Sequence, residues 1–280
     1  MREIDGHTKL LGLMGYPVEH TYSPQMHNYI SQVYGRNYAY MALPVLPGQL
    51  GDAVRGLKAL NFAGVNVTAP YKVEVMQYLD EIAPDAKLYG SVNTVKYENG
   101  KLYGYNTDAD GFYLSLVNGG APVIGKDLLI LGAGGAARPI CVKFAMLGAK
   151  SITILNRTQK NADALAEFVK EACGYEVHTK REHARYDVVM NTTSAGMEPD
   201  IDACPISDFS FVDGDTAAAD MIYNPPETVF LKKMKEHGAR VCINGLGMLI
   251  YQGIVAYEIF TGEKIDHAIY DDIKREVFGL

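Results

Sequence analysis

The sequence has few of the features that mark secreted, membrane-spanning or metal-binding proteins. Only four of its 280 residues are cysteine. They lie far apart, with no Cys-x-x-Cys pair, so neither a disulfide framework nor a cysteine metal site is expected. No His-Glu-x-x-His motif occurs, and no apolar run reaches the ~20 residues that a membrane helix needs. The first residues lack the apolar core of a signal peptide. These absences predict reduced thiols, no metal and a cytoplasmic location.

An excess of basic residues is also absent. Lys and Arg number 26 against 33 Asp and Glu, which gives a net charge of −7. Such a balance has no general attraction for nucleic acid or anionic lipid, so we expect a small-molecule substrate rather than either of these partners. The composition, 48% hydrophobic and 21% charged, is that of a globular chain. The length predicts about two domains. The oligomeric state is left open, with a homodimer as one alternative.

Apolar segments alternate with helical patterns along the chain, which predicts an α/β fold. The expected strands are 9–15, 38–44, 63–68, 94–97, 101–105, 127–131, 151–155, 187–191, 217–222 and 240–243. The expected helices are 24–34, 50–60, 73–79, one ending at 147, 161–172, 248–260 and 267–278. We therefore expect an N-terminal α/β substrate-binding and catalytic domain, 1–105, and a Rossmann-type dinucleotide-binding domain with a parallel sheet, 106–245. The helices of 246–280 are expected to pack back on the N-terminal domain.

A glycine-rich turn lies near the start of the second domain. It follows the strand expected at 127–131, precedes a helix, and consists of Gly132, Ala133, Gly134, Gly135 and Ala136. Small residues here let the backbone approach a pyrophosphate, and the helix N-terminus offers free N–H groups. Dinucleotide binding is therefore predicted. The alternative is a tight strand–helix turn without a ligand.

The end of the next strand bears on which dinucleotide is bound. Asn156, Arg157 and Thr158 stand where NAD-binding folds usually place an acidic residue for the ribose 2′-hydroxyl. An arginine beside an amide and a hydroxyl can instead bind a 2′-phosphate through charge-assisted hydrogen bonds. NADP is therefore favoured. NAD remains the alternative, with Arg157 stacked on the adenine.

Polar patches in the first domain are candidates for a substrate site. Thr21 and Ser23 precede Pro24 at an expected helix start, where Ser23 is either an ordinary N-cap or, with Thr21, a ligand of an anionic group. Asn66 and Thr68 point to one face of a strand. Lys72 follows in the first turn of an expected helix. It is either a solvated surface lysine or, because a helix N-terminus and partial burial favour proton loss, a group for acid–base chemistry.

Two further patches have competing explanations. Asn93 lies in the segment Gly90–Thr94, which alone reads as an ordinary turn before a strand. Asp108 either caps the helix that follows it or serves the site. The string from Asp108 to Gly111 is no EF-hand calcium loop, because Tyr113 and Gly119 stand where glycine and a bidentate Glu are needed.

Taken together, these motifs resemble the shikimate dehydrogenase family, including its quinate/shikimate dehydrogenase branch. The matching pieces run in family order over nearly the whole chain. They are 15–24, 66–72, 93–94, 104–108, 132–137, 156–158, 191–197, 220–225 and 245–252. The resemblance implies a two-domain enzyme with its active site in the cleft between the domains. Members interconvert 3-dehydroshikimate and shikimate with NADP(H), a step towards the aromatic amino acids, and some use quinate or NAD(H).

The resemblance also implies roles for individual residues. Lys72 and Asp108 are the catalytic acid–base pair that it implies. The residues expected around the carboxylate and hydroxyls of the substrate are Thr21, Ser23, Asn66, Thr68, Asn93, Tyr223 and Gln252. Met221 and Gly245 are expected near the nicotinamide, with the glycine turn and Asn156–Thr158 holding the rest of the dinucleotide.

Two departures from the family pattern leave the specificity open. Thr21 stands where many shikimate-specific members have serine, which leaves shikimate against quinate undecided. Asn161 stands where NADP-preferring members often have Arg or Lys, which leaves NAD open as the cofactor. The competing functions are a relative of methylene-tetrahydrofolate dehydrogenase and a non-enzymatic sensor of a dinucleotide and a cyclic acid. The two hydroxyls at Thr21 and Ser23 speak against the first, and the Lys72/Asp108 pair speaks against the second.

Overall fold

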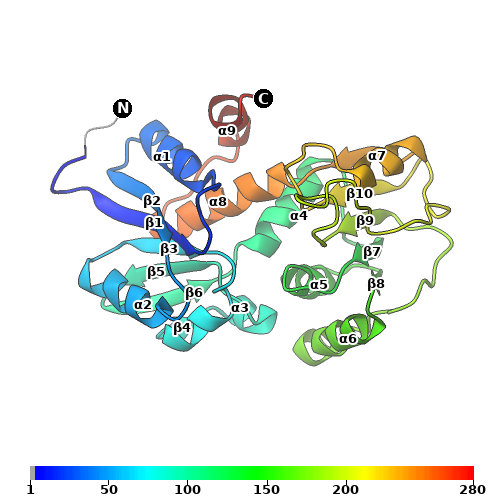
Figure 1. Cartoon of the computed structure of the whole chain (residues 1–280), viewed down its shortest axis with the longest axis horizontal. Coiled ribbons are helices and arrows are strands. Elements are labelled where there is room, and N and C mark those ends of the chain that lie inside the picture. Colours follow the sequence, from blue (N-terminus) through cyan, green and yellow to red (C-terminus); the bar gives the residue numbers. More distant parts are fainter. Residues whose placement is uncertain (1–3) are drawn as a thin grey trace. The chain divides into compact units, whose positions relative to one another are not determined.

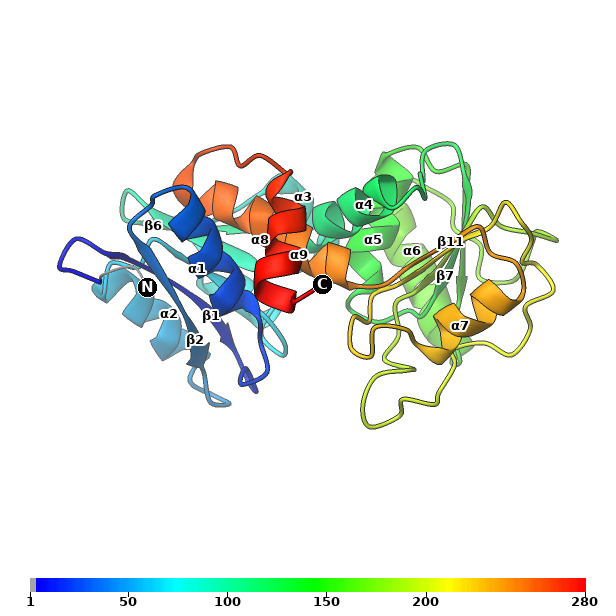
Figure 2. The same ribbon diagram turned by 90° about the horizontal axis from the view of Figure 1, so that it is seen from above.

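The computed structural model describes residues 4–280, which form two compact units (Figures 1 and 2). One unit contains the residues up to Thr107 together with Ile250–Leu280, and the other is Asp108–Leu249. Each unit has its own sheet, so the predicted α/β class is confirmed. Between residues 4 and 280 no helix combines the length and the apolar character that a membrane crossing requires.

The first unit is built on a mixed sheet of six strands in the order β2-β1-β3-β5-β6-β4. The strands are β1 (Lys9–Gly15), β2 (Tyr38–Pro44), β3 (Gly64–Val67), β4 (Glu81–Ile82), β5 (Thr94–Glu98) and β6 (Lys101–Tyr105). β1 pairs in parallel with β2 and β3, whereas β5 is antiparallel to both β3 and β6. The hairpin between β5 and β6 turns at Asn99 and Gly100, whose φ values of 51° and 80° are positive, as a two-residue Asn-Gly turn requires.

Helices cover both faces of this sheet. They are α1 (Ser23–Val33), α2 (Leu50–Ala59), α3 (Pro84–Tyr89), α8 (Leu246–Thr261) and α9 (Ile269–Phe278), with a short 3₁₀ helix at Glu74–Tyr78. α2 packs on the face that carries Val65. Neighbouring Gly64 points the other way, where any side chain would collide with Phe260 of α8. α9 lies along α1 (Figure 2), with the rings of Tyr22 and Phe278 5.0 Å apart.

The second unit is built on a parallel sheet of five strands in the order β11-β10-β9-β7-β8. The strands are β7 (Asp127–Leu131), β8 (Ser151–Leu155), β9 (Val188–Asn191), β10 (Ala217–Asp220) and β11 (Val241–Ile243). The helices are α4 (Asp108–Asn118), α5 (Ala137–Met146), α6 (Gln159–Cys173) and α7 (Val229–Glu236). β8 is added on one side of β7, and β9 and the later strands on the other side, so the strand order reverses between β7 and β9. In open α/β sheets, ligands bind at the carboxyl edge beside such a reversal.

Three short elements were not predicted from the sequence. β4 has two residues and α3 has six, too few for a period to be recognised. α7 has a clearer signal, because Thr228 caps it by accepting a hydrogen bond from the Leu231 N–H at 3.3 Å. A threonine before an apolar segment should have been recognised as a helix start.

The imidazole of His27, on α1, is buried in the first unit without a hydrogen bond. Its side chain is 0% exposed, and neither ring nitrogen has a hydrogen-bond partner among residues 4–280. The imidazole stacks on the ring of Tyr40, with centroids 4.2 Å apart and planes 4° apart. Burial lowers the pKa of His27 to about 3 from the ordinary 6.5. The ring is therefore neutral at physiological pH and packs as an apolar aromatic.

We expect this histidine to make the protein acid-sensitive. Below pH 6.5 the unfolded chain binds a proton at His27, whereas the folded chain does not bind it until the pH is near 3. The free energy of unfolding therefore falls as the pH falls. For this group the loss is about 2 kcal/mol between pH 7 and pH 5. Urea unfolding at pH 7 and pH 5 gives the free energy of unfolding of the wild type and of His27→Phe. The wild type should lose more of this free energy between the two pH values than the variant does. His237→Gln, at an exposed histidine, is the control; identical pH dependence in the wild type and His27→Phe would contradict the assignment.

Candidate active site

Asn66 and Asn93 form the centre of a buried polar cluster in the first unit. Asn66 lies on β3, and Asn93 precedes β5; they are 5% and 2% exposed. The Asn66 Nδ2 donates to the Asn93 carbonyl at 3.2 Å and to Thr94 Oγ1 at 3.0 Å. Asn93 Oδ1 accepts from the Thr107 N–H at 2.8 Å. The segment around Asn93 is therefore more than an ordinary turn, because its amide ties the start of β5 to the residue before Asp108.

Thr21 and Ser23 lie at the start of α1, although not as a simple cap. Ser23 is the first residue of the helix, Tyr22 is its N-cap, and no side chain caps α1. The N-cap alternative for Ser23 is therefore wrong. Instead, Thr21 Oγ1 accepts a hydrogen bond from the Ser23 N–H at 3.1 Å. Pro24, which has no N–H to satisfy, occupies the first turn.

Thr68 and Lys72 follow β3 in a turn. The Thr68 N–H donates to the Met14 carbonyl at 2.9 Å, and the Lys72 carbonyl accepts from the Val92 N–H at 2.8 Å. The backbone of Lys72 thus runs beside the segment that carries Asn93. The expected helix at 73–79 is a 3₁₀ helix of five residues that begins at Glu74. Lys72 is therefore outside it, and the argument from a helix dipole does not apply to this lysine.

Gln252 and Asp108 are placed by helices. Gln252 lies on α8, whose next residue, Gly253, packs so closely on α1 that any side chain would collide with Met26. Asp108 is the first residue of α4 and directly follows Thr107. Nearby Asp110 has a structural partner, because Lys143 of α5 donates to its carboxylate at 2.6 Å.

The glycine turn of the second unit fits a dinucleotide pyrophosphate. Gly132 has φ +112°, and a Cβ there would lie 2.8 Å from Thr192 Oγ1 and 2.7 Å from the Thr193 side chain, so only glycine fits. A Cβ at Gly134 or Gly135 would meet no atom within 4 Å. No side chain caps the N-terminus of α5. The turn therefore offers open backbone and uncapped N–H groups, as bound phosphate requires.

Asn156, Arg157 and Thr158 follow β8 beside this turn. The Gly132 N–H donates to the Leu155 carbonyl at 2.8 Å, which joins the two segments. Asn156 Nδ2 donates to the Thr158 carbonyl at 2.9 Å. Arg157 and Thr158 are exposed. No acidic side chain in the described part of the chain pairs with Arg157, so its guanidinium is available for a phosphate.

Met221 and Tyr223 follow β10, and Gly245 follows β11, at the same carboxyl edge of the sheet. The Met221 N–H donates to the Asn191 carbonyl at 3.0 Å, and the Gly245 N–H donates to the Ile222 carbonyl at 2.9 Å. A side chain at Gly245 would collide with the Met221 carbonyl. Tyr223 lies one residue beyond Ile222 and is half-buried. These contacts bring residues 191, 221 and 245 together.

A buried carboxylate organises this edge and was not predicted from the sequence. Asp220 is 0% exposed. Its oxygens accept from the Ile222 N–H at 2.9 Å, Thr228 Oγ1 at 2.7 Å and Asn191 Nδ2 at 3.1 Å. Burial raises the pKa of Asp220, and these donors act in the opposite direction. Asp220 thus fixes the segment that carries Met221.

Residues 4–280 contain no group of three or more His, Cys, Asp or Glu side chains that could hold a metal. The four cysteines form no disulfide.

Three family models match the chain. They are the shikimate dehydrogenase substrate binding domain at residues 13–95, shikimate / quinate 5-dehydrogenase at 120–200, and the shikimate 5'-dehydrogenase C-terminal domain at 245–277. The chain belongs to the shikimate dehydrogenase family. A relative named shikimate dehydrogenase (NADP(+)) from Carboxydothermus hydrogenoformans is 47% identical over 92% of this chain and 94% of its own. A relative of the same name from Methanococcus aeolicus is 44% identical over 94% of this chain and 95% of its own.

Solved structures of family members have the same fold. A shikimate dehydrogenase in complex with NADP+ has a TM-score of 0.89 and 43% identity, with 96% of each chain covered. The Listeria monocytogenes shikimate 5-dehydrogenase in complex with shikimate and NAD has a TM-score of 0.89 and 33% identity, with 98% of each covered. The Corynebacterium glutamicum quinate dehydrogenase in complex with NAD has a TM-score of 0.86 and 30% identity, with 97% of this chain and 98% of that chain covered. Family members thus differ in both substrate and dinucleotide.

Proposed function

We propose that this protein catalyses the reversible, NADP-dependent reduction of 3-dehydroshikimate to shikimate in the shikimate pathway. The observation that carries the proposal is membership of a family whose members are oxidoreductases of this kind, at 47% identity over 92% of the chain to one named shikimate dehydrogenase (NADP(+)). The local geometry supports it. One unit has a dinucleotide turn at the reversal point of a parallel sheet, and the other has a buried amide cluster beside the backbone of Lys72.

We assign the roles of the residues as follows. Lys72 and Asp108 act as the acid–base pair. The substrate's carboxylate and hydroxyls are bound by Thr21, Ser23, Asn66, Thr68, Asn93, Tyr223 and Gln252. The dinucleotide is bound by Gly132, Ala133, Gly134, Gly135, Ala136, Asn156, Arg157, Thr158, Met221 and Gly245.

The residue types match what the reaction needs. Reduction of a ring ketone requires hydride at the carbon, which the reduced nicotinamide supplies when bound, and a proton at the developing alkoxide. Lys72 as an ammonium either donates this proton or stabilises the alkoxide while water donates it. In the oxidative direction neutral Lys72 accepts the proton. Asp108 orients the lysine and shares the hydrogen bonds of the reacting hydroxyl. Ser23 and Thr21 supply hydroxyl donors to the carboxylate.

Arg157 supports NADP as the dinucleotide. Its guanidinium is exposed and flanked by Asn156 and Thr158, and an arginine fork can bind a 2′-phosphate through two parallel hydrogen bonds. Lys160 and Asn161 follow on the first turn of α6 and are exposed as well. Asn161 adds no charge, so NAD is a second, weaker cofactor in this proposal.

A second function has one specific observation in its favour. Thr21 has a methyl group that serine lacks, and this changes the shape of the subsite proposed for the carboxylate. Quinate carries a further hydroxyl on the carbon that bears its carboxylate. A quinate/shikimate dehydrogenase that uses NAD as well as NADP is therefore the alternative.

A two-by-two steady-state comparison tests both functions. Purified protein is assayed with shikimate or quinate, each with NADP⁺ or NAD⁺, and nicotinamide reduction is followed by absorbance. We expect the highest kcat/KM for shikimate with NADP⁺. A higher kcat/KM for quinate would establish the alternative, and no absorbance change in any of the four assays would overturn both.

The cellular setting belongs to the proposal too. We place the protein in the cytoplasm, with a homodimer as the candidate assembly and no nucleic-acid or membrane partner. Fractionation of the native cells and light scattering of the purified protein are the direct measurements.

A further inference from the structure

Tyr40 of β2 is a buried tyrosine for which the proposed reaction has no direct use. Its side chain is 2% exposed. The hydroxyl donates to Asn66 Oδ1 at 2.8 Å, and the side chain of Ser23 lies beside it. Asn66 and Ser23 are both proposed to bind the substrate, and they come from β3 and α1. One phenol oxygen thus connects two parts of the proposed substrate site.

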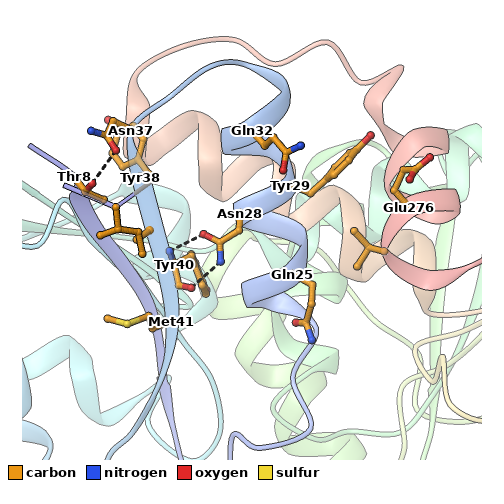
Figure 3. A pocket seen from close by; sticks show the side chains of 13 residues that line it. Thr8, Gln25, Asn28, Tyr29, Gln32, Asn37, Tyr38, Tyr40, Met41 and Glu276 are labelled. Atoms are coloured by element: carbon orange, nitrogen blue, oxygen red, sulfur yellow. Dashed lines mark hydrogen bonds between the residues drawn. The ribbon is translucent and has the colours of Figure 1, made fainter. Parts of the chain in front are cut away.

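Two consecutive residues of α1 hold Tyr40 from the other side. β2 is the outermost strand of its sheet, so the outward polar backbone atoms of Tyr40 have no strand to pair with. The Asn28 side chain pairs with both of them, donating to the Tyr40 carbonyl and accepting from its N–H at 2.9 Å each (Figure 3). The groove between α1, β2 and α9 in this view has a volume of about 470 Å³. His27 stacks on the ring. Tyr40 is thereby fixed at its backbone and its ring.

The partners of Asn66 determine what its amide presents. A backbone carbonyl can only accept, so the group that faces the Asn93 carbonyl at 3.2 Å must be the Asn66 NH₂. The second proton of this NH₂ goes to Thr94 Oγ1, whose own proton goes to Asn93 Oδ1 at 2.9 Å. Both amide protons of Asn66 are therefore used inside the protein. What remains is Oδ1, with one lone pair taken by Tyr40 and the other without a donor among residues 4–280.

We infer that Tyr40 is a positioning residue for substrate recognition, which holds Asn66 Oδ1 as a fixed acceptor for a substrate hydroxyl and sets its distance from Ser23. The inference rests on the proposed function and adds a residue to it. Tyr40 itself does not touch the substrate in this scheme; it acts through Asn66. Without the phenol, Asn66 Oδ1 loses its donor, and the amide is held through its NH₂ alone.

Substitution of Tyr40 by phenylalanine tests the inference. Tyr40→Phe keeps the ring stack on His27 and removes only the hydroxyl. We expect the KM for shikimate to rise about tenfold, with kcat changed less than threefold and the KM for NADP⁺ unchanged, because a buried acceptor that loses its donor no longer keeps a fixed position for the substrate hydroxyl. Tyr257→Phe is the matched control. It removes another fully buried hydroxyl of the same unit, bonded to Ser31 at 3.0 Å, and should leave both KM values unchanged.

A double-mutant cycle separates action through Asn66 from a general effect. In an Asn66→Ala background, Tyr40→Phe should cause no further rise in the KM for shikimate. A second tenfold rise in that background would overturn the inference. So would a wild-type KM for shikimate in Tyr40→Phe, or an equal rise in the KM for NADP⁺. If the wild type itself turns over neither shikimate nor quinate, the proposed function fails, and this role fails with it.

Discussion

We expect Lys72→Ala to lower kcat by about a thousandfold while the Kd for NADP⁺ stays within twofold of wild type. Positioned acid–base groups contribute typically 10²–10⁴-fold in rate, and Lys72 is the only proposed proton-handling cation. Its backbone is fixed by the hydrogen bond to Val92, so truncation of the side chain removes the amine without removing the turn. Steady-state kinetics and fluorescence titration of the dinucleotide measure the two quantities.

Lys101→Ala is the matched control. Lys101 lies in the same unit, is exposed, and pairs with Glu81 at 2.8 Å; surface pairs of this kind contribute at most about 1 kcal/mol. Its kcat should match the wild type. Addition of a small primary amine should restore part of the activity of Lys72→Ala and should leave the kcat of Lys101→Ala unchanged. Loss of dinucleotide binding by a folded Lys72→Ala protein would show that the lysine serves the cofactor instead.

We expect Arg157→Ala to lower kcat/KM for NADP⁺ about a hundredfold and to change kcat/KM for NAD⁺ less than threefold. The two dinucleotides differ by the 2′-phosphate, and a guanidinium fork on a phosphate is among the stronger charge-assisted contacts. Arg157→Lys should show an intermediate loss, since it keeps the charge and loses the fork. The measurement is kcat/KM for each dinucleotide at saturating shikimate.

Arg185→Ala is the control for this prediction. Arg185 is an exposed arginine of the same unit that precedes β9, at the amino edge of the sheet, and pairs with Asp213 at 3.3 Å. Its removal should leave both dinucleotides unaffected. Equal weakening of NADP⁺ and NAD⁺ by Arg157→Ala would mean that Arg157 stacks on the adenine, and no weakening of either would remove it from the site.

Much of the fold could be predicted from local patterns. The strands β1, β2, β6, β7 and β8 begin and end where the sequence predicts them, because buried strands read as short apolar runs bounded by turn residues. The helix expected to end at 147 ends at Met146, with Leu147 as its C-cap and Gly148 next at φ +87°. These features depend on neighbours within a few positions, so one sequence is enough to locate them.

The candidate site could be predicted only in part. Hydroxyls, amides and the lysine were recognised as polar groups beside strand and helix ends, and the glycine turn was recognised by its spacing. Tyr40, His27 and Asp220 were missed, since a tyrosine within a strand, a histidine within a helix and an acidic residue at a strand end have no distinctive local pattern. Their meaning comes from partners such as Asn66 and Asn191, which lie 26 and 29 positions away along the chain.

The sequence by itself determined the α/β class, the dinucleotide turn and the set of polar groups available for chemistry, because period, turn type and residue chemistry are local properties. The tertiary structure decided how those groups are oriented. It showed that Ser23 is no cap, that Lys72 lies outside a helix, and that Asn66 presents an oxygen rather than an NH₂. Orientation of this kind follows from hydrogen bonds between distant segments, which exist only once the sheets have formed.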